Sequence, residues 1–221
     1  MIILHHLNNS RSQRILWLLE ELEVEYEIKH YERDPKTMLA PKELKEVHPM
    51  GKSPILEDGD IKMAESGAII EYLATTYGKD RFTSLNEEEN RKVIYWLHFA
   101  EGSLMPQLLL SLVFTTLKNA PVPFLVKPII KSIVKKVQNA YIGPEITIRL
   151  EHINDHLKDH EWFAGKHLTS ADFIMIFPLE AAEARGLLKD KFPYILSYVQ
   201  KVQKLDTYKK ALEKGGPYSL S

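Results

Sequence analysis

The stretch His48-Pro49-Met50-Gly51-Lys52-Ser53-Pro54-Ile55-Leu56 decides the fold. Proline cannot donate a hydrogen bond to a β-ladder, so Pro54 at the start of a strand indicates an edge or a special turn. A cis Ser53–Pro54 bond would leave a neighbouring backbone N–H and C=O unpaired, and an extended peptide can bind such an edge through its main chain. Lys52 would then stand beside the edge as a partner for an anion. The alternative is an ordinary turn that binds no ligand.

Short strand-like and helix-like segments lie on both sides of this stretch. Before it, the hydrophobic pattern predicts a strand, a helix, a strand and a helical turn, at residues 2–7, 12–23, 26–31 and 41–47. After it, strands at 54–57 and 61–63 flank the hairpin signal Asp58-Gly59-Asp60, and a helix at 65–77 ends at Gly78. The order βαβ, helix, ββα requires a parallel pair with a right-handed crossover and an added antiparallel strand. We therefore expect a small mixed sheet with helices packed on it.

The second part of the chain has a different pattern, because strand signals disappear after about residue 86. Helical periodicity covers residues 87–118, 144–160, 171–185, 194–204 and 207–213. Gly78 to Asn86 is the predicted linker. The sequence thus predicts two domains, a mixed α/β domain at residues 1–80 and an all-α domain at residues 87–221.

Composition excludes several classes of function. The chain has 221 residues, 44% of them hydrophobic, and a net charge of −1, which is ordinary for a globular protein with a core. A nucleic-acid-binding protein normally shows a basic excess, so we expect no nucleic-acid partner. Without cysteine, the chain has no disulfide, cysteine-bound metal or cysteine nucleophile. No targeting segment and no uninterrupted apolar run of about 18 residues is visible, so we expect a cytoplasmic protein.

Two further segments carry polar groups where a ligand could bind. Asn9, Ser10 and Ser12 lie between a strand end and a helix start, where free N–H groups and the helix dipole favour an anion. The alternative is that one serine simply caps the helix. Glu65 and Ser66 precede the next helix, where they could hold the ammonium and carboxylate of an amino acid or serve only as caps.

Together, these motifs resemble the glutathione-binding signature of the soluble glutathione S-transferases. The resemblance rests on Pro49-x-Gly51-Lys52-Ser53-Pro54-x-Leu56, Glu65-Ser66-x-Ala68-Ile69-x-x-Tyr72-Leu73 and Leu168-Thr169-x-Ala171-Asp172. It spans nearly the whole chain, and Asn9-Ser10-Arg11-Ser12 is nearer the bacterial and fungal branches than the tyrosine-dependent classes. The resemblance implies a thioredoxin-like N-terminal domain of βαβ-α-ββα order, followed by an all-helical C-terminal domain.

The resemblance also implies a role for each motif residue. The main chain of Ser53, next to cis-Pro54, would pair with the cysteinyl backbone of glutathione. Glu65 and Ser66 would hold the γ-glutamyl end. Lys52 would approach the glycyl carboxylate.

Activation of the glutathione thiol would fall to the loop before the first helix. A thiol with a pKa of about 8.5 must become a thiolate to attack, and a hydroxyl donor with a helix N-terminus can stabilise that charge. We expect Ser10 in this catalytic role, with Asn9 and Ser12 as alternatives. No tyrosine precedes Tyr26, so the residue used by tyrosine-dependent members is missing.

Less specific signals concern the rest of the cavity. An electrophile pocket would be walled by apolar and aromatic residues of the long helices, namely Tyr95, Trp96, Phe99 and Met105, with Leu109 and Tyr141 as further candidates. The alternative is that this stripe belongs to the core. Ala40 stands where some members have a basic residue near the glycyl carboxylate, so Lys36 or Lys42 would replace it.

Asp172 and a histidine stripe are expected to be structural. Asp172 ends the capping-box-like Thr169-Ser170-Ala171-Asp172 at a helix start. His152, His156 and His160 lie four apart, where a metal could bridge two of them, but we expect a solvated helix face and no metal site.

The segment between Glu101 and Glu145 contains no acidic residue. Its five lysines alternate with apolar residues: Lys118, Lys127, Lys131, Lys135 and Lys136. Such a basic amphipathic stretch can attach to an anionic membrane surface. We favour the alternative, a helix that packs its apolar side on the domain while the lysines face water.

The resemblance therefore implies a glutathione transferase with a role in detoxification. It would use glutathione as co-substrate, need no tightly bound cofactor, and conjugate the thiolate to hydrophobic electrophiles. The resemblance implies a homodimer, in which Glu101 could face the partner's site. The alternatives are a glutathione-dependent peroxidase or disulfide reductase without a protein cysteine, and a non-catalytic binding or scaffold module of the same fold.

Overall fold

The computed structural model of the chain describes residues 1–78, 81–82, 84, 86–216 and 218–220. The strands described in its N-terminal part are β1 (Ile2–Leu7), β2 (Tyr26–Tyr31), β3 (Ile55–Asp58) and β4 (Ile61–Ala64). The helices of this part are α1 (Gln13–Leu22), α2 (Glu43–Val47) and α3 (Ser66–Tyr77). The order is βαβ-α-ββα, so the predicted fold class is confirmed.

The four strands form one mixed sheet in the order β2-β1-β3-β4. β1 is parallel to β2 and antiparallel to β3, and β4 is antiparallel to β3. Side chains alternate between the two faces of a strand, so β1 supplies both sides of the sheet. Ile2 and Leu4 join the main core with α1 and α3, whereas Leu7 packs with Leu44 of α2 on the other face. The two neighbouring histidines of β1 therefore point to opposite faces.

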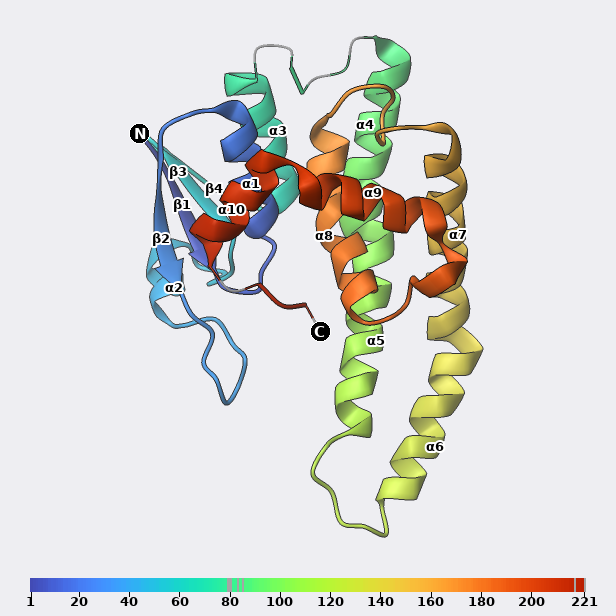
Figure 1. The fold of residues 1–221 in the computed structure, drawn as a ribbon. Helices are drawn as coiled ribbons and strands as arrows, with labels where there is room; N and C mark the ends of the chain where they lie inside the picture. Colours follow the sequence, from blue (N-terminus) through green and yellow to red (C-terminus); the bar gives the residue numbers. More distant parts are fainter. Residues whose placement is uncertain (79–80, 83, 85, 217, 221) are drawn as a thin grey trace.

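The rest of the chain is helical (Figure 1). One continuous run consists of α4 (Glu87–Phe99), the π-turn η1 (Ala100–Leu104) and α5 (Met105–Lys118). A second run consists of α6 (Lys127–Val137), the π-turn η2 (Gln138–Ile142) and α7 (Gly143–Asp159). The chain continues through α8 (Ser170–Ala184), the short 3₁₀ turn η3 (Lys189–Lys191), α9 (Pro193–Lys204) and α10 (Asp206–Gly215).

α8 is the buried centre of the molecule and contacts α1, α3, α4 and α9. Its residues are apolar on nearly every side, which suits a helix enclosed by others. At its start, Asp172 accepts the N–H groups of Phe163 and Thr169, each at 2.9 Å, and the hydroxyl of Tyr198 at 3.1 Å. A capping box is present, and these contacts give Asp172 a structural position.

α10 returns from the helical part to pack against α1. The approach is close at Gly215, where an added Cβ would lie 2.9 Å from Leu16 Cδ1. The carbonyl of Gly215 also accepts a hydrogen bond from His6 Nε2 at 3.0 Å. β1 and α10 therefore meet on the face of the sheet that α1 covers.

In the predicted linker Gly78 to Asn86, residues 79–80, 83 and 85 lie outside the described residues.

By length and composition alone, the run Glu87–Lys118 could cross a membrane, with a mean hydropathy of 1.2 in its most apolar window. One such helix is a weak indication, and here the run packs against α7 and α8.

Candidate active site

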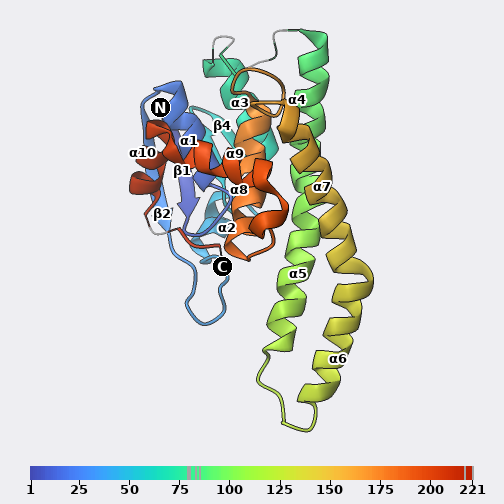
Figure 2. The same ribbon diagram turned by 45° about the vertical axis from the view of Figure 1, so that its right-hand side comes forward.

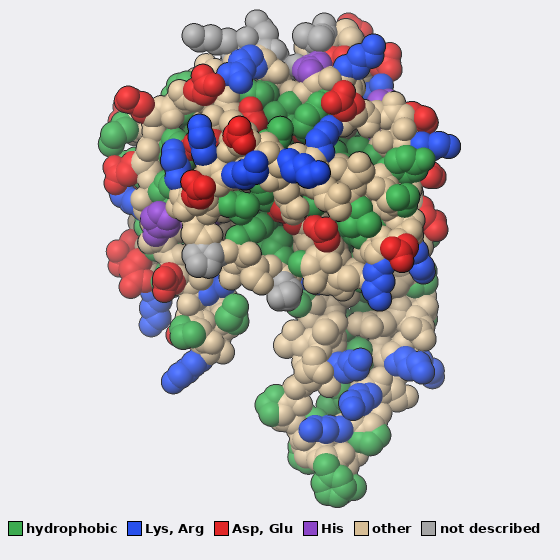
Figure 3. Space-filling view, in the orientation of Figure 1, with side chains coloured by type: hydrophobic (Ala, Val, Ile, Leu, Met, Phe, Trp, Pro, Cys, Tyr) green, Lys and Arg blue, Asp and Glu red, His purple; other side chains and the backbone are tan. Residues whose placement is uncertain are grey.

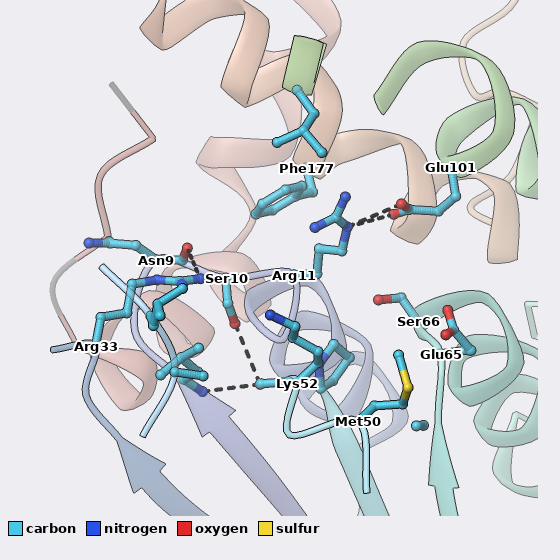
Figure 4. A pocket seen from close by; sticks show the side chains of 17 residues that line it. Asn9, Ser10, Arg11, Arg33, Met50, Lys52, Glu65, Ser66, Glu101 and Phe177 are labelled. Carbon is cyan, nitrogen blue, oxygen red and sulfur yellow. Dashed lines mark hydrogen bonds and ion pairs between the residues drawn. The ribbon is translucent and has the colours of Figure 1, made fainter. Parts of the chain in front are cut away.

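A cavity of about 540 Å³ opens at the carboxyl end of β1, between the sheet and the helices α5 and α8 (Figure 4). The predicted catalytic and glutathione-binding residues that line it are Asn9, Ser10, Lys52, Ser53, Pro54, Glu65 and Ser66. Ser12 is fully buried behind them and does not line it. The fold thus brings together three separate segments of the sequence, at residues 9–10, 52–54 and 65–66.

The Ser53–Pro54 bond is cis, as predicted. The hydroxyl of Ser53 donates to the carbonyl of His5 at 2.9 Å and accepts the N–H of Leu7 at 3.2 Å. Its side chain is therefore tied to β1. The ladders of β3 begin at Ile55, so they do not use the backbone of Ser53. That backbone lines the cavity at the end of the strand.

Glu65 and Ser66 lie on the side of the cavity opposite Asn9 (Figure 4). Glu65 has φ +71°, a left-handed conformation that costs a non-glycine residue about 1–3 kcal/mol. This strained residue directly follows β4 and is exposed, so its carboxylate is available to a ligand. Ser66 begins α3 and is buried, and the first N–H groups of a helix have no partner within it. The rim therefore offers a carboxylate next to a helix N-terminus.

The cations of the cavity are Lys52, Arg11 and Arg33. Arg33 follows β2 and donates to the carbonyls of Met38 at 3.0 Å and Asn9 at 3.3 Å. Lys36 and Lys42, expected to replace a basic residue at Ala40, do not line the cavity. The sequence motifs did not point to Arg33, and the signal that could have found it is its position two residues after β2, whose end lies beside that of β1.

A buried hydrogen-bond chain runs from Ser10 to His6. Ser10 Oγ lies 2.8 Å from Ser12 Oγ, which lies 2.8 Å from His6 Nδ1. Burial lowers the pKa of His6 to about 4, so its ring is neutral at pH 7. Nε2 carries the proton donated to the carbonyl of Gly215, so Nδ1 accepts from Ser12. The hydrogen of Ser12 is thereby committed, and the hydrogen of Ser10 can turn to Ser12 or to a ligand in the cavity.

The side chain of Asn9 is held by the C-terminal tail. Its φ is +50°, a region that asparagine tolerates better than most residues. Its Oδ1 accepts the N–H of Ser219 at 2.7 Å. The carboxamide is therefore oriented with its oxygen towards the C-terminal tail, which leaves the NH₂ group as the end that can donate to a ligand.

Glu101 joins the helical part to the loop before α1. Arg11 Nε lies 3.1 Å from both carboxylate oxygens of Glu101, and the buried Arg14 also binds it. Burial alone would raise the pKa of Glu101, but the charges of Arg14 and Arg11 outweigh burial and hold the pKa below its usual range. The π-turn η1 carries Glu101 to this position. Glu101, which the resemblance allows to face a partner's site, lines the cavity of its own chain.

The predicted electrophile wall lies elsewhere. Trp96 and Met105 are buried in the core, and Tyr95 and Phe99 line a separate hollow with His152. The apolar residues that line the cavity include Leu39, Met50, Leu109 and Phe177. Of these, the sequence suggested only Leu109. Arg11 Cζ lies 5.6 Å from the centroid of the Phe177 ring. The position of Phe177 depends on how α8 packs.

Of the three histidines at the end of α7, His156 and His160 are more enclosed than the expected solvated face, whereas His152 is exposed. His152 Nε2 lies 2.9 Å from the hydroxyl of Tyr95. His156 and His160 bond backbone carbonyls at 2.9 Å, and their rings stack 4.2 Å apart. Within the described residues, no group of three or more potential ligands gathers around a point.

The fold and the cavity define a thioredoxin-like domain joined to a helical domain, with a peptide-sized polar site between them. The family model described as "Glutathione S-transferase, N-terminal domain" matches residues 1–75. The model described as "Glutathione S-transferase, C-terminal domain" matches residues 122–206. The chain belongs to the glutathione S-transferase family.

Curated relatives and solved structures agree with this. Glutathione S-transferase 3 of Schizosaccharomyces pombe is 38% identical over 97% of this chain and 88% of its own. Glutathione S-transferase 1 of Saccharomyces cerevisiae is 30% identical over 97% and 95%. A glutathione S-transferase of Actinobacillus pleuropneumoniae is 33% identical, with a TM-score of 0.82 over 100% of this chain and 95% of that one. A Phanerochaete chrysosporium glutathione transferase, solved with oxidized glutathione, is 25% identical, with a TM-score of 0.75 over 97% and 96%.

Proposed function

We propose that this protein conjugates the thiolate of glutathione to hydrophobic electrophiles. The observation that carries the proposal is the cavity, where a free strand-edge backbone lies between an acidic helix start and a basic loop. Glutathione has an extended backbone, one ammonium and two carboxylates. The cavity matches each of these groups with a residue of complementary charge or hydrogen-bonding type.

Each part of glutathione has a partner in this proposal. Glu65 takes the ammonium of the γ-glutamyl end, and Ser66 with the N–H groups of α3 takes its carboxylate. The backbone of Ser53 pairs with the cysteinyl residue. Lys52 and Arg33 are the cations available to the glycyl carboxylate. No metal or tightly bound cofactor enters this scheme.

The thiol then lies near the loop of Asn9 and Ser10. Ser10 is the proposed donor to the thiolate, because its hydroxyl hydrogen is the one that the His6 chain leaves free to turn. Asn9 is the alternative donor. Each unit by which the pKa of the thiol falls corresponds to about 1.4 kcal/mol of preference for the thiolate.

The electrophile occupies the apolar side of the same cavity in this proposal. Leu109 of α5 and Phe177 of α8 form its helical wall, and Leu39 and Met50 lie on the sheet side. Residues 1–80 thus bind glutathione, while residues 87–221 supply the second substrate site. A cytoplasmic homodimer, as in the family, completes the proposal, and sedimentation of the purified protein tests the dimer.

Calorimetric titration with glutathione tests the binding site. We expect wild-type binding in the micromolar to millimolar range and at least tenfold weaker binding by Glu65→Ala, a loss of about 1.4 kcal/mol. Glu71→Ala is the matched control, because Glu71 is an exposed glutamate of α3, the helix that Glu65 precedes, and does not line the cavity. The control should bind as the wild type does. If the wild type is folded but does not bind glutathione, the proposed enzymatic function is wrong, and the protein is a scaffold of this fold.

Activity measurements then separate the reaction types. We expect turnover of aryl halides or other hydrophobic electrophiles, with consumption of one glutathione for each conjugate. Strong activity with hydroperoxides or small disulfides and weak activity with aryl halides would replace conjugation by a peroxidase or disulfide-reductase function.

A further inference from the structure

The helical hairpin of α5 and α6 extends beyond the body of the molecule as an arm. We define the arm as residues 113–136, which include the second half of α5, the connecting loop and most of α6. In both ribbon views its tip points away from the sheet and from the other helices (Figures 1 and 2). The arm therefore presents a surface that the rest of the chain does not cover.

The arm exposes apolar side chains at its tip and along one side. Phe124 is 77% exposed and Leu125 is 71% exposed, and both lie in the loop. Ile129 and Ile133 of α6 are more than half exposed, whereas Val134 is buried. α6 thus uses only part of its apolar face to pack on the molecule. This corrects the expectation that its apolar side would pack on the domain.

The same surface carries only positive charge. Lys118, Lys127, Lys131, Lys135 and Lys136 are all exposed, and no acidic residue lies between Glu101 and Glu145. None of the five lysines forms an ion pair with a described residue. Figure 3 shows lysine and apolar side chains together on the arm. A projecting end that combines both kinds of side chain is unusual for a solvated tip.

We propose that the arm binds the surface of an anionic lipid bilayer. A basic amphipathic helix lies in such an interface with its apolar side chains at the acyl boundary and its lysines at the anionic headgroups. Phe124 and Leu125 enter the interface first because they are at the tip. Each lysine near an anionic surface strengthens binding about fivefold at low salt. The binding does not depend on glutathione turnover.

Charge argues against a second arm as the occupant. A two-fold contact of arm with arm places the same patch of both copies face to face. Lysines would then oppose lysines, with no carboxylate on the arm to offset them. An anionic bilayer supplies the missing negative charge and an apolar layer together.

Co-sedimentation of the full-length chain with vesicles tests the proposal. The vesicles are pure phosphatidylcholine, or phosphatidylcholine with about one third phosphatidylserine. We expect binding to the second kind only, weakened by salt. A quadruple glutamine variant of α6 should bind at least tenfold more weakly: Lys127→Gln, Lys131→Gln, Lys135→Gln and Lys136→Gln.

Two controls distinguish binding by the arm from effects of net charge and of exposed aromatic side chains in general. A second quadruple variant removes four exposed lysines elsewhere and should bind as the wild type does: Lys158→Gln, Lys166→Gln, Lys191→Gln and Lys204→Gln. Phe124→Ser should weaken binding at least threefold, whereas Tyr194→Ser, another exposed aromatic, should not. Thermal melting checks that each variant is folded.

Three results would overturn the proposal. The first is the absence of binding to phosphatidylserine vesicles by the folded wild type. The second is equal weakening in both quadruple variants, which assigns binding to net charge alone. The third is a change of oligomeric state in Phe124→Ser without any vesicle binding by the wild type, which makes the arm a contact between copies.

Discussion

Ser10 and Asn9 present two different donors to the same side of the cavity. Ser10 has a hydroxyl whose hydrogen is shared with the buried Ser12, and Asn9 has an amide whose oxygen is held by Ser219. The neutral ring of His6 fixes the direction of this chain, because its Nδ1 can only accept. The hydrogen-bond chain of Ser10, Ser12 and His6 thus contains no charged side chain.

We expect Ser10→Ala to raise the pKa of the bound glutathione thiol by about one unit, because the thiolate loses a donor worth about 1.4 kcal/mol. The ultraviolet absorbance of the thiolate against pH measures this pKa, and the pH profile of kcat/KM should shift in the same direction. Ser12→Ala is the control behind the cavity and should shift the pKa less. If Asn9→Ala alone raises the pKa, the catalytic role belongs to Asn9.

Local signals account for most elements of the sheet half. The apolar run of β1, the Asp58-Gly59-Asp60 hairpin and the Ser53–Pro54 turn each depend on residues that are close in sequence, so the strands and their order follow from the pattern. The side of the cavity to which we assign glutathione could be predicted for the same reason, since its residues lie at strand ends and helix starts. The electrophile side could not. Phe177 reaches the cavity through the packing of α8, which no local pattern encodes.

Burial also decided two features of the helical half that the sequence left open. An aromatic stripe at helical spacing has the same pattern whether it faces a core or a ligand, so Trp96 was a candidate although it is buried. Likewise, the lysine-rich α6 has one amphipathic pattern for a packed helix and for a projecting one. Only the position of the hairpin shows that Ile129 is exposed.

At the level of elements, the contact of α10 with α1 requires a residue without a side chain at Gly215. Gly215→Ala would place a Cβ against Leu16 at 2.9 Å and closer still to Gln13, both of them buried. Overpacking of this kind costs roughly 1–3 kcal/mol. We expect the melting temperature to fall by roughly 2–12 °C in a protein of this size.

Gly102→Ala is the matched control for this change. Gly102 lies in the helical run of α4 and α5, and an added Cβ there meets nothing within 4 Å. Its melting temperature should stay the same or rise slightly, because alanine favours a helix more than glycine does. Equal melting temperatures of the two variants would show that the close approach at Gly215 does not constrain the fold.

For the whole molecule, buried titrating groups set the stability at acid pH. Burial lowers the pKa of His6 to about 4 and that of His156 also to about 4, from an ordinary value of 6.5. Both rings are neutral in the folded state, so the unfolded chain binds more protons between pH 6.5 and 4, and stability falls as the pH falls through this window. Burial raises the pKa of Asp172 to about 6, which acts in the opposite direction below that pH.

We expect the melting temperature to fall by several degrees between pH 7 and pH 5. At pH 5 His6 alone removes about 2 kcal/mol, while Asp172 returns about 1 kcal/mol. Calorimetry across this range measures the loss, and proton uptake on unfolding should accompany it. A melting temperature that stays constant or rises on acidification would contradict the neutral, buried state of His6.

The hydrogen bond between His6 and Gly215 joins residues 209 positions apart. A ribosome makes the chain from its N-terminus at roughly 5–20 residues per second, so Gly215 appears on the order of 10–40 s after His6. During that interval the sheet residues have left the ribosome, but the partner that orients His6, Ser12 and Ser10 does not yet exist. The strands can form early, whereas the end of the cavity beside Ser10 is completed only when synthesis has passed α10.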